Sequence, residues 1–135
     1  MPSIPLPPPQ EDQIFGPSTG ELSGTVMDYA YSSGRRYRMT FDVGTLSFDH
    51  LNGPARGVRV GPVPYRARAL RDGQFLVCWT LKQPSLVHVT LIVDFARGQI
   101  HVSGMMPPNQ WEFFDIGELR RVTHTDPAGE RAAHA

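Results

Sequence analysis

The sequence contains one cysteine, no excess of either charge and no long apolar run. Cys78 has no partner for a disulfide within the chain, which excludes a fold held together by cystines. Lys and Arg number 13, as do Asp and Glu, and the basic residues are interleaved with the others, which argues against nucleic acid as a partner. No apolar run approaches the roughly 20 residues that span a bilayer, and MPSIPLPPPQ at the start lacks the regions of a secretory signal. These absences predict a cytoplasmic protein with no membrane partner.

The length of 135 residues and the distribution of proline predict one domain with a terminal arm. Residues 1–13 contain five prolines and too few apolar groups for a core, so we expect a flexible or surface-draped arm. The domain itself is expected over residues 14–122. Residues 123–135 have little apolar content and are predicted to form a flexible tail.

From Leu22 onward, short runs of β-branched and aromatic residues alternate with Gly, Pro, Asp and Asn. This pattern is typical of an all-β domain. Glycine at the end of several separators, such as Asp72-Gly73, supplies the positive φ of a tight hairpin turn, so we expect an antiparallel meander. The eight predicted strands are 22–31, 35–42, 45–50, 65–71, 74–81, 86–95, 99–106 and 110–122.

Eight antiparallel strands expose two sheet edges unless the sheet closes, so we predict a closed β-barrel. A barrel of about eight strands holds either packed side chains or one small ligand. Strand alternation places four bulky residues inward, and the outer face of strand 86–95 is also partly apolar, which favours a homodimer interface or a wrapped arm over open solvent. The inward residues are Val77, Trp79, Leu81 and Leu91.

Three tyrosines lie at even spacing within the segment 25–41. Tyr29, Tyr31 and Tyr37 are expected to share one face of a ribbon, because successive side chains of a strand point to opposite faces. Ser32-Ser33-Gly34 would form the turn between its two arms. Each buried hydroxyl needs a partner, so either a ligand pocket or ordinary core packing explains the cluster.

Two families resemble this chain. The run Y-A-Y-S-S-G-R-R-Y resembles the Y-x-Y-x-x-G-x-x-Y element of bacterial phenolic acid decarboxylases, which are lipocalin-like (calycin) barrels acting without metal or organic cofactor. Three later runs, D-G-Q-F-L-V-C-W-T, H-V-T-L-I-V-D-F-A-R-G-Q-I-H-V-S and W-E-F-F-D-I-G-E-L, are similar to MoaF-like proteins, small barrels related to molybdenum cofactor biosynthesis protein F. Together these segments cover residues 25–122. The resemblance implies a single lipocalin-like barrel and no cofactor.

The decarboxylases bind the substrate carboxylate with two tyrosines of this element, and an arginine assists. The resemblance therefore implies catalytic roles for Tyr29 and Tyr31, and it makes Tyr37 the third aromatic residue of the element. The arginine would correspond to Arg56 or Arg59 in the Gly- and Pro-rich segment 53–64, the longest connection expected and a cover for a site.

This sequence departs from the decarboxylases at one position of the resemblance, that of the glutamate that handles the phenolic proton in those enzymes. Leu81 stands at that position, just after the W-T pair, and it can neither donate nor accept a proton. The resemblance still implies a site in which two phenols and an arginine bind a carboxylate or an enolate. In a dry barrel, such donors form charge-assisted hydrogen bonds to an anion.

Histidines and a fourth tyrosine complete the candidates. His88 and His101 lie on neighbouring predicted strands, but no third ligand is spaced with them as a metal would require, and both lie on the face opposite to the inward set. We predict no metal site. A register shift of one residue would bring His88 into the lumen as a general base, so His88 remains a catalytic candidate. Tyr65 is a candidate for substrate binding or for packing.

These observations predict a cofactor-free lyase or isomerase that acts on an unsaturated or aromatic acid or ketone in a barrel pocket. Tyr and Arg side chains would stabilise an anionic intermediate. The alternatives are a non-catalytic small-molecule carrier or sensor, and an accessory subunit that uses the same barrel. The tyrosine spacing favours a catalytic function, whereas Leu81, in place of the glutamate, argues against one.

Overall fold

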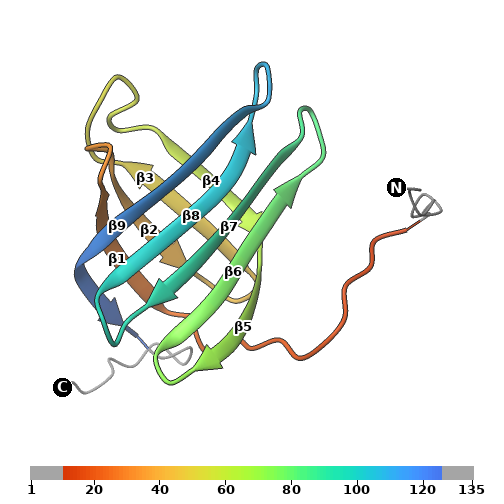
Figure 1. The fold of residues 1–135 in the computed structure, drawn as a ribbon, viewed down its shortest axis with the longest axis vertical. Coiled ribbons are helices and arrows are strands. Elements are labelled where there is room, and N and C mark those ends of the chain that lie inside the picture. Colours follow the sequence, from red (N-terminus) through yellow and green to blue (C-terminus); the bar gives the residue numbers. More distant parts are fainter. Residues whose placement is uncertain (1–10, 126–135) are drawn as a thin grey trace, which may run out of the picture.

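The computed structural model describes residues 11–125, which form an antiparallel β-barrel (Figure 1). Its nine strands have the sheet order β4-β3-β2-β1-β9-β8-β7-β6-β5. The prediction of an all-β barrel is confirmed, with nine strands in place of about eight. Within residues 11–125, no helix is long and apolar enough to cross a membrane. The strands are β1 (Thr25–Tyr31), β2 (Arg36–Phe41), β3 (Thr45–His50), β4 (Arg59–Pro64), β5 (Arg66–Arg71), β6 (Gln74–Leu81), β7 (Val87–Asp94), β8 (Gln99–Met106) and β9 (Trp111–His124).

The additional strand is β4, which lies in the segment expected to be irregular. It pairs with β3, and after the single residue Tyr65 the chain continues as β5, which pairs with β6. This bent segment brings the two ends of the sheet together and nearly closes the barrel. Pro62 and Pro64 cannot donate backbone hydrogen bonds, which suits an edge strand. Gly61 has a φ of 119° where the register with β3 shifts, and a Cβ there would lie 2.7 Å from the carbonyl oxygen of Leu46.

The segment before β1 runs along the outside of β5. The Thr19 backbone N–H donates to the Ala67 carbonyl at 2.9 Å, and Arg68 Nε donates to the Pro17 carbonyl at 2.7 Å. Asp12 pairs with Lys82, with 2.9 Å between carboxylate oxygen and Nζ. Residues 1–10 of the predicted arm and 126–135 of the predicted tail lie outside the described residues. At the other end, β9 continues to His124, beyond the expected end at residue 122.

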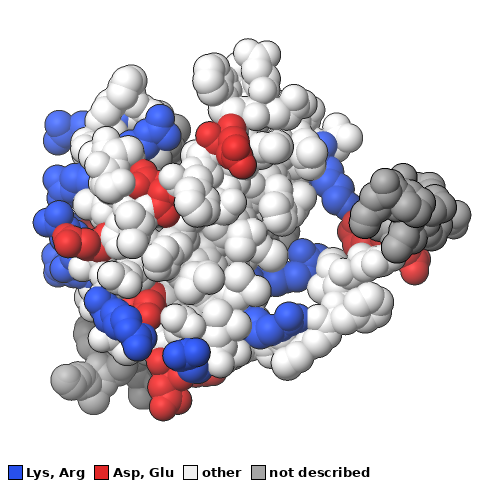
Figure 2. Space-filling model, viewed as in Figure 1, with Lys and Arg blue, Asp and Glu red and all other residues white. Residues whose placement is uncertain are grey.

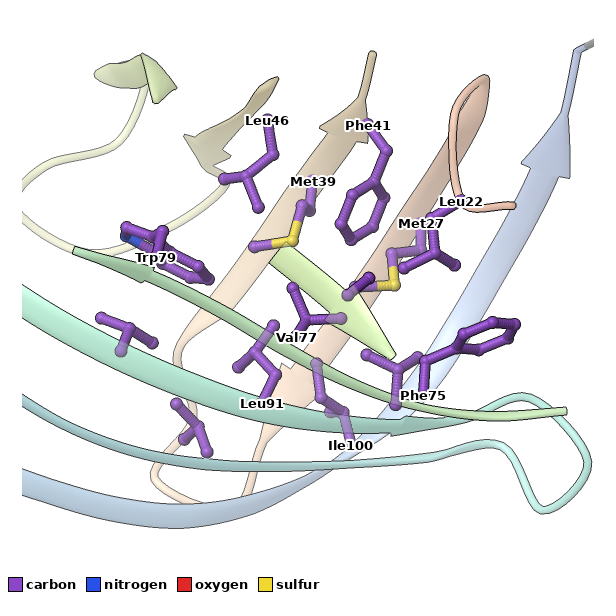
Figure 3. Packing of buried hydrophobic residues seen from close by; sticks show 14 of the residues in the cluster. Leu22, Met27, Met39, Phe41, Leu46, Phe75, Val77, Trp79, Leu91 and Ile100 are labelled. Carbon is purple, nitrogen blue, oxygen red and sulfur yellow. The ribbon is translucent and has the colours of Figure 1, made fainter. Parts of the chain in front are cut away.

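The barrel interior is packed solid at one end (Figure 3). This closed end holds the turns between β2 and β3, between β5 and β6, and between β7 and β8, at the lower side of Figure 1. Phe41 and Leu46 are fully buried there, and Leu22, from the segment before β1, packs against the same cluster. Burying such side chains stabilises the fold by about 1.5–3 kcal/mol each. Other buried members of the same cluster include Met27, Phe75, Val77, Val93 and Ile100.

The outer surface has one charged side and one nearly uncharged side. Across five strands, opposite charges alternate in register, as Arg59–Asp49–Arg38–Asp28–Arg121. Arg38 Nε lies 2.7 Å from Asp28 Oδ1, and Arg59 Nη1 lies 2.8 Å from Asp49 Oδ2. Figure 2 shows charged side chains gathered on the β1 and β9 side, whereas the middle of the view, over β7 and β8, is mostly uncharged. The homodimer through this uncharged face stays a prediction.

Candidate functional site

A cavity of about 430 Å³ occupies the opposite, open end of the barrel. This end carries the connections β1–β2, β3–β4, β6–β7 and β8–β9, at the upper side of Figure 1. A cavity of this size holds one small organic molecule. Its lining comes from every strand except β5 and from the β1–β2 turn. The lining residues are Tyr29, Tyr31, Ser33, Arg35, Tyr37, Met39, Phe48, His50, Val60, Trp79, Leu81, Val87, Val89, Leu91, Val102, Met106, Glu112, Phe113, Phe114 and Asp115.

Three tyrosines form a compact cluster in the wall of this cavity. The ring centroids of Tyr29 and Tyr31 are 5.3 Å apart, and those of Tyr31 and Tyr37 are 5.9 Å apart, both with edge-to-face geometry. Tyr29 and Tyr37 are 5.7 Å apart. These separations fall in the range of favourable aromatic pairs. The expected common face of the three phenols is therefore present, and it faces the cavity.

Strand register and one glycine explain how the three rings fit together. Tyr29 and Tyr37 are directly opposite each other in the β1–β2 ladder. Tyr31 is opposite Gly117 of β9, where an added Cβ would lie 2.9 Å from Tyr31 Cδ1 and 2.6 Å from the Ala30 carbonyl oxygen. A side chain at residue 117 would therefore collide with the Tyr31 ring. The sequence positions of the tyrosines place them on a common face, and the absence of a side chain at Gly117 leaves space for the Tyr31 ring.

Both phenols on β1 are held in their neutral form. Burial is the main cause that raises the pKa of Tyr29 well above the ordinary tyrosine value, and the neighbouring phenols of Tyr31 and Tyr37 add to it. Burial also raises the pKa of Tyr31, followed by the proximity of Tyr37, although the interaction with the Tyr29 hydroxyl acts in the opposite direction. The two hydroxyls are therefore hydrogen-bond donors at neutral pH and not phenolates.

The mouth of the cavity carries the charged groups. Arg35 lies in the turn after Tyr31, and Glu112 and Asp115 lie on β9. Ser32 Oγ donates to Asp115 Oδ1 at 2.5 Å, which ties the β1–β2 turn to β9. Burial raises the pKa of Asp115, but hydrogen bonds from the two turn serines and a backbone N–H outweigh it and hold the pKa below its ordinary value.

The remaining walls are apolar, as the strand alternation of β6 and β7 predicts. Trp79 is almost fully buried, and its ring centroid is 5.9 Å from that of Phe48. Leu81 and Leu91 also line the cavity. Val77 shares the inward face but lies deeper, in the packed core, so it does not contact the cavity.

The structure does not bring the predicted arginines to the cavity. Arg59 belongs to β4, where alternation turns it outward to Asp49 and turns its neighbour Val60 inward. Arg56 is exposed in the connection between β3 and β4. The guanidinium that does line the mouth is Arg35. Sequence reasoning missed it, although Arg35 has the same strand parity as Tyr37.

His88 and Tyr65 also lie away from the cavity. His88 is exposed on the outer face of β7, where its Nδ1 lies 2.7 Å from Thr80 Oγ1, so the register shift that would bring it inside does not occur. Tyr65 lies at the closed end, with its ring 5.2 Å from that of Phe41 and its hydroxyl donating to the Asp42 carbonyl at 3.4 Å. The histidine that lines the cavity is His50, at the end of β3.

No cluster of three or more His, Cys, Asp or Glu side chains within residues 11–125 is arranged to hold a metal ion. The polar side chains that line the described cavity include its three phenols, Arg35, His50 and the two carboxylates of β9.

Comparison with protein families gives one match, to the MoaF N-terminal domain over residues 12–106. The chain belongs to the MoaF N-terminal domain family. This match confirms the MoaF-like resemblance of the sequence. It covers β1 to β8 of this MoaF-family barrel but not β9, so Glu112 and Asp115 lie outside the matched region.

Comparison with solved structures supports the fold. The crystal structure of a provisionally assigned β-lactamase from Burkholderia vietnamiensis is similar to this chain with a TM-score of 0.64 and 20% sequence identity. The similarity covers 73% of this chain and 93% of that chain. At this identity the likeness concerns the barrel and not its chemistry. No curated protein matches the sequence.

Proposed function

We propose that this MoaF-family barrel binds a small unsaturated or aromatic acid or ketone in its open end and catalyses a cofactor-free lyase or isomerase step on it. The observation that carries the proposal is the cluster of Tyr29, Tyr31 and Tyr37, with ring centroids 5.3–5.9 Å apart in a cavity whose deeper walls are apolar. Neutral phenols in a dry site are donors for the negative charge that develops on a carboxylate or enolate oxygen.

The shape of the cavity supports a ligand with an apolar body and one polar end. Trp79, Leu81 and Leu91 surround the body of such a ligand, and Arg35 at the mouth attracts a carboxylate. In this arrangement Arg35 takes the role that the sequence assigned to Arg56 or Arg59. Catalysis without a metal then depends on how strongly the phenols favour the anionic intermediate over the bound substrate.

The test is a mass-spectrometric screen of the purified protein with hydroxycinnamates, related enoic acids and β-keto compounds. Each of Tyr29→Phe and Tyr31→Phe is expected to lose about tenfold to a thousandfold of the turnover, because each removes one donor to the developing oxyanion. Tyr65→Phe is the matched control, since it removes a phenol at the closed end and leaves the cavity lining intact. Turnover that survives both cavity substitutions would contradict the phenol site.

The second candidate function is a carrier or sensor that binds the same class of molecule without changing it. Leu81 favours this alternative, because an aliphatic side chain lines the cavity where the decarboxylases would have a proton-transferring glutamate. A carrier would bind members of the screen without product formation. Binding that is unchanged in both tyrosine variants would assign recognition to the apolar walls alone.

A further inference from the structure

His50 is a histidine in the cavity for which the fold itself selects the tautomer. Its Nδ1 lies 2.8 Å from the Val58 carbonyl oxygen, and a carbonyl only accepts hydrogen bonds, so Nδ1 carries a proton. The proton-free nitrogen of the neutral ring is therefore Nε2. Within residues 11–125, Nε2 has no hydrogen-bond partner. A cavity-lining imidazole with a fixed N–H on one side and an unoccupied lone pair on the other is the arrangement of a general base.

The backbone holds this ring in place. The backbone N–H of His50 donates to the same Val58 carbonyl at 3.0 Å, and Gly57 N–H donates to the His50 carbonyl at 2.9 Å. One carbonyl thus accepts from both the main chain and the side chain of His50. The ring is packed against Tyr37, at 5.2 Å between centroids, and against Phe48, at 5.8 Å. These contacts fix its orientation before any ligand binds.

The base and the phenols lie in one row across the barrel. Tyr37 is directly opposite both Tyr29 on β1 and His50 on β3. In the pose required for proton transfer, a ligand oxygen lies among the phenols and its adjacent carbon lies on the side toward β3. Neutral hydroxyl donors on one side and a proton acceptor on the other are what proton removal next to a carbonyl requires, because the electron pair of the broken C–H bond moves onto the carbonyl oxygen.

We infer that His50 is the general base of this site and that its substrate class is keto acids with an apolar substituent and an enolisable C–H bond beside the carbonyl. This inference rests on the proposed function and names its chemistry. His50 Nε2 takes the proton from the carbon beside the ketone carbonyl, and the C–H electron pair forms a carbon–carbon double bond. The carbonyl oxygen becomes an enolate oxygen, which the phenols hold. The imidazolium then returns the proton to carbon, so the step needs no oxidant or cofactor. Leu81 leaves no carboxylate at its own position to compete for this role.

The test uses phenylpyruvate in D₂O, with proton NMR following deuterium uptake at the methylene carbon between its ring and its ketone. Wild-type protein is expected to accelerate the exchange over buffer, because the imidazolium trades its proton with solvent before returning it. His50→Gln is expected to lose about a hundredfold or more of this acceleration. His88→Gln is the matched control, because it removes a histidine from the outer face. It is expected to retain the wild-type rate.

A pH profile and a binding measurement separate the base from a structural role. The wild-type exchange rate is expected to depend on pH, because only a neutral imidazole accepts a proton, and His50→Gln should lack this dependence. Long-range ¹⁵N–¹H spectra should show a proton on Nδ1 in the neutral ring. The other titratable or charged groups that line the same cavity are Arg35, Tyr29, Tyr31, Tyr37, Glu112 and Asp115.

In a Trp111→Phe background, which leaves Trp79 as the sole tryptophan, fluorescence quenching reports phenylpyruvate binding independently of exchange. Binding without accelerated exchange in the wild type would overturn the inference and leave the proposed site intact as a carrier. Exchange by folded His50→Gln within a few-fold of the wild-type rate would also overturn it. If none of the carbonyl compounds of the screen binds or reacts, the proposed function itself fails, and this inference fails with it.

Discussion

The two ends of the barrel interior use the same strands for different purposes. On β2, Phe41 at the closed end is fully buried in the packed core, whereas Tyr37 at the open end lines a cavity of about 430 Å³. On β1 the same change runs from Met27 to Tyr31, and on β3 from Leu46 to His50. At these positions, β1, β2 and β3 carry aliphatic or phenylalanine side chains where they pack and hydroxyl or imidazole groups where they meet the cavity. The packed core and the polar lining are thus separated along the barrel axis.

This separation predicts that substitutions at the two ends of β2 have different effects. Phe41→Ala is expected to lower the free energy of unfolding by about 3–5 kcal/mol, because it leaves a hole in close-packed surroundings. Tyr37→Phe is expected to cost about 1 kcal/mol or less, because the ring remains and only the hydroxyl is lost. Urea unfolding followed by circular dichroism measures both. Equal costs at the two positions would contradict the division into a packed end and an open end.

Gly117→Ala is expected to disturb the open end directly. The added methyl group would lie 2.6 Å from the Ala30 carbonyl oxygen and 2.9 Å from Tyr31, so we expect a loss of about 1–3 kcal/mol in the free energy of unfolding and weaker ligand binding. Gly20→Ala is the control, because no atom lies within 4 Å of a Cβ placed there. The measurements are urea unfolding and Trp79 fluorescence titration. Ligand binding at the wild-type level in a folded Gly117→Ala protein would show that the Tyr31 ring position does not matter for the site.

Alkaline pH should destabilise the protein through the phenols of the open end. The pKa values of Tyr29 and Tyr31 are raised in the folded state, mainly by burial. Their contribution to stability is therefore complete below the unfolded tyrosine pKa of about 10 and is lost as the pH rises through the folded values. Urea unfolding measured in steps above pH 9 should show this loss, and Tyr29→Phe should show a smaller one. The same slope in Tyr29→Phe and wild type would mean that Tyr29 titrates as an exposed phenol.

Asp115→Asn is expected to have the smallest effect, about 1 kcal/mol or less, because the turn it holds is partly exposed. The pKa of Asp115 is lowered in the folded state, so its stabilising effect is present above the unfolded pKa of about 3.9 and is lost as the pH falls through the folded value. Urea unfolding of wild type and variant at pH 7 and at acidic pH should therefore converge at low pH. If the difference in unfolding free energy between wild type and Asp115→Asn stayed the same at acidic pH, the effect would come from the shape of the side chain and not from its charge.

Much of the fold could be predicted from the chain because period-two alternation and turn glycines are local signals. The predicted ranges 45–50, 74–81 and 99–106 agree with β3, β6 and β8. Strand β4 escaped prediction because Gly61, Pro62 and Pro64 are typical of a loop, and only pairing with β3 makes an edge strand of them. The candidate site was predicted where parity sufficed, as for the tyrosines and Trp79. Arg35 and His50 were missed because their positions beside a turn carry no local signal of facing a cavity.

The sequence by itself determined that the chain is all-β, that three phenols share one face and that the walls around them are apolar, because strand alternation depends only on neighbouring residues. The tertiary structure decided which arginine and which histidine join the phenols. That choice depends on the height of each residue along the barrel axis and on the register between strands far apart in the chain, such as β1 with β9. It also decided that one end is packed and the other hollow, because packing density is a property of facing strands and not of any one of them.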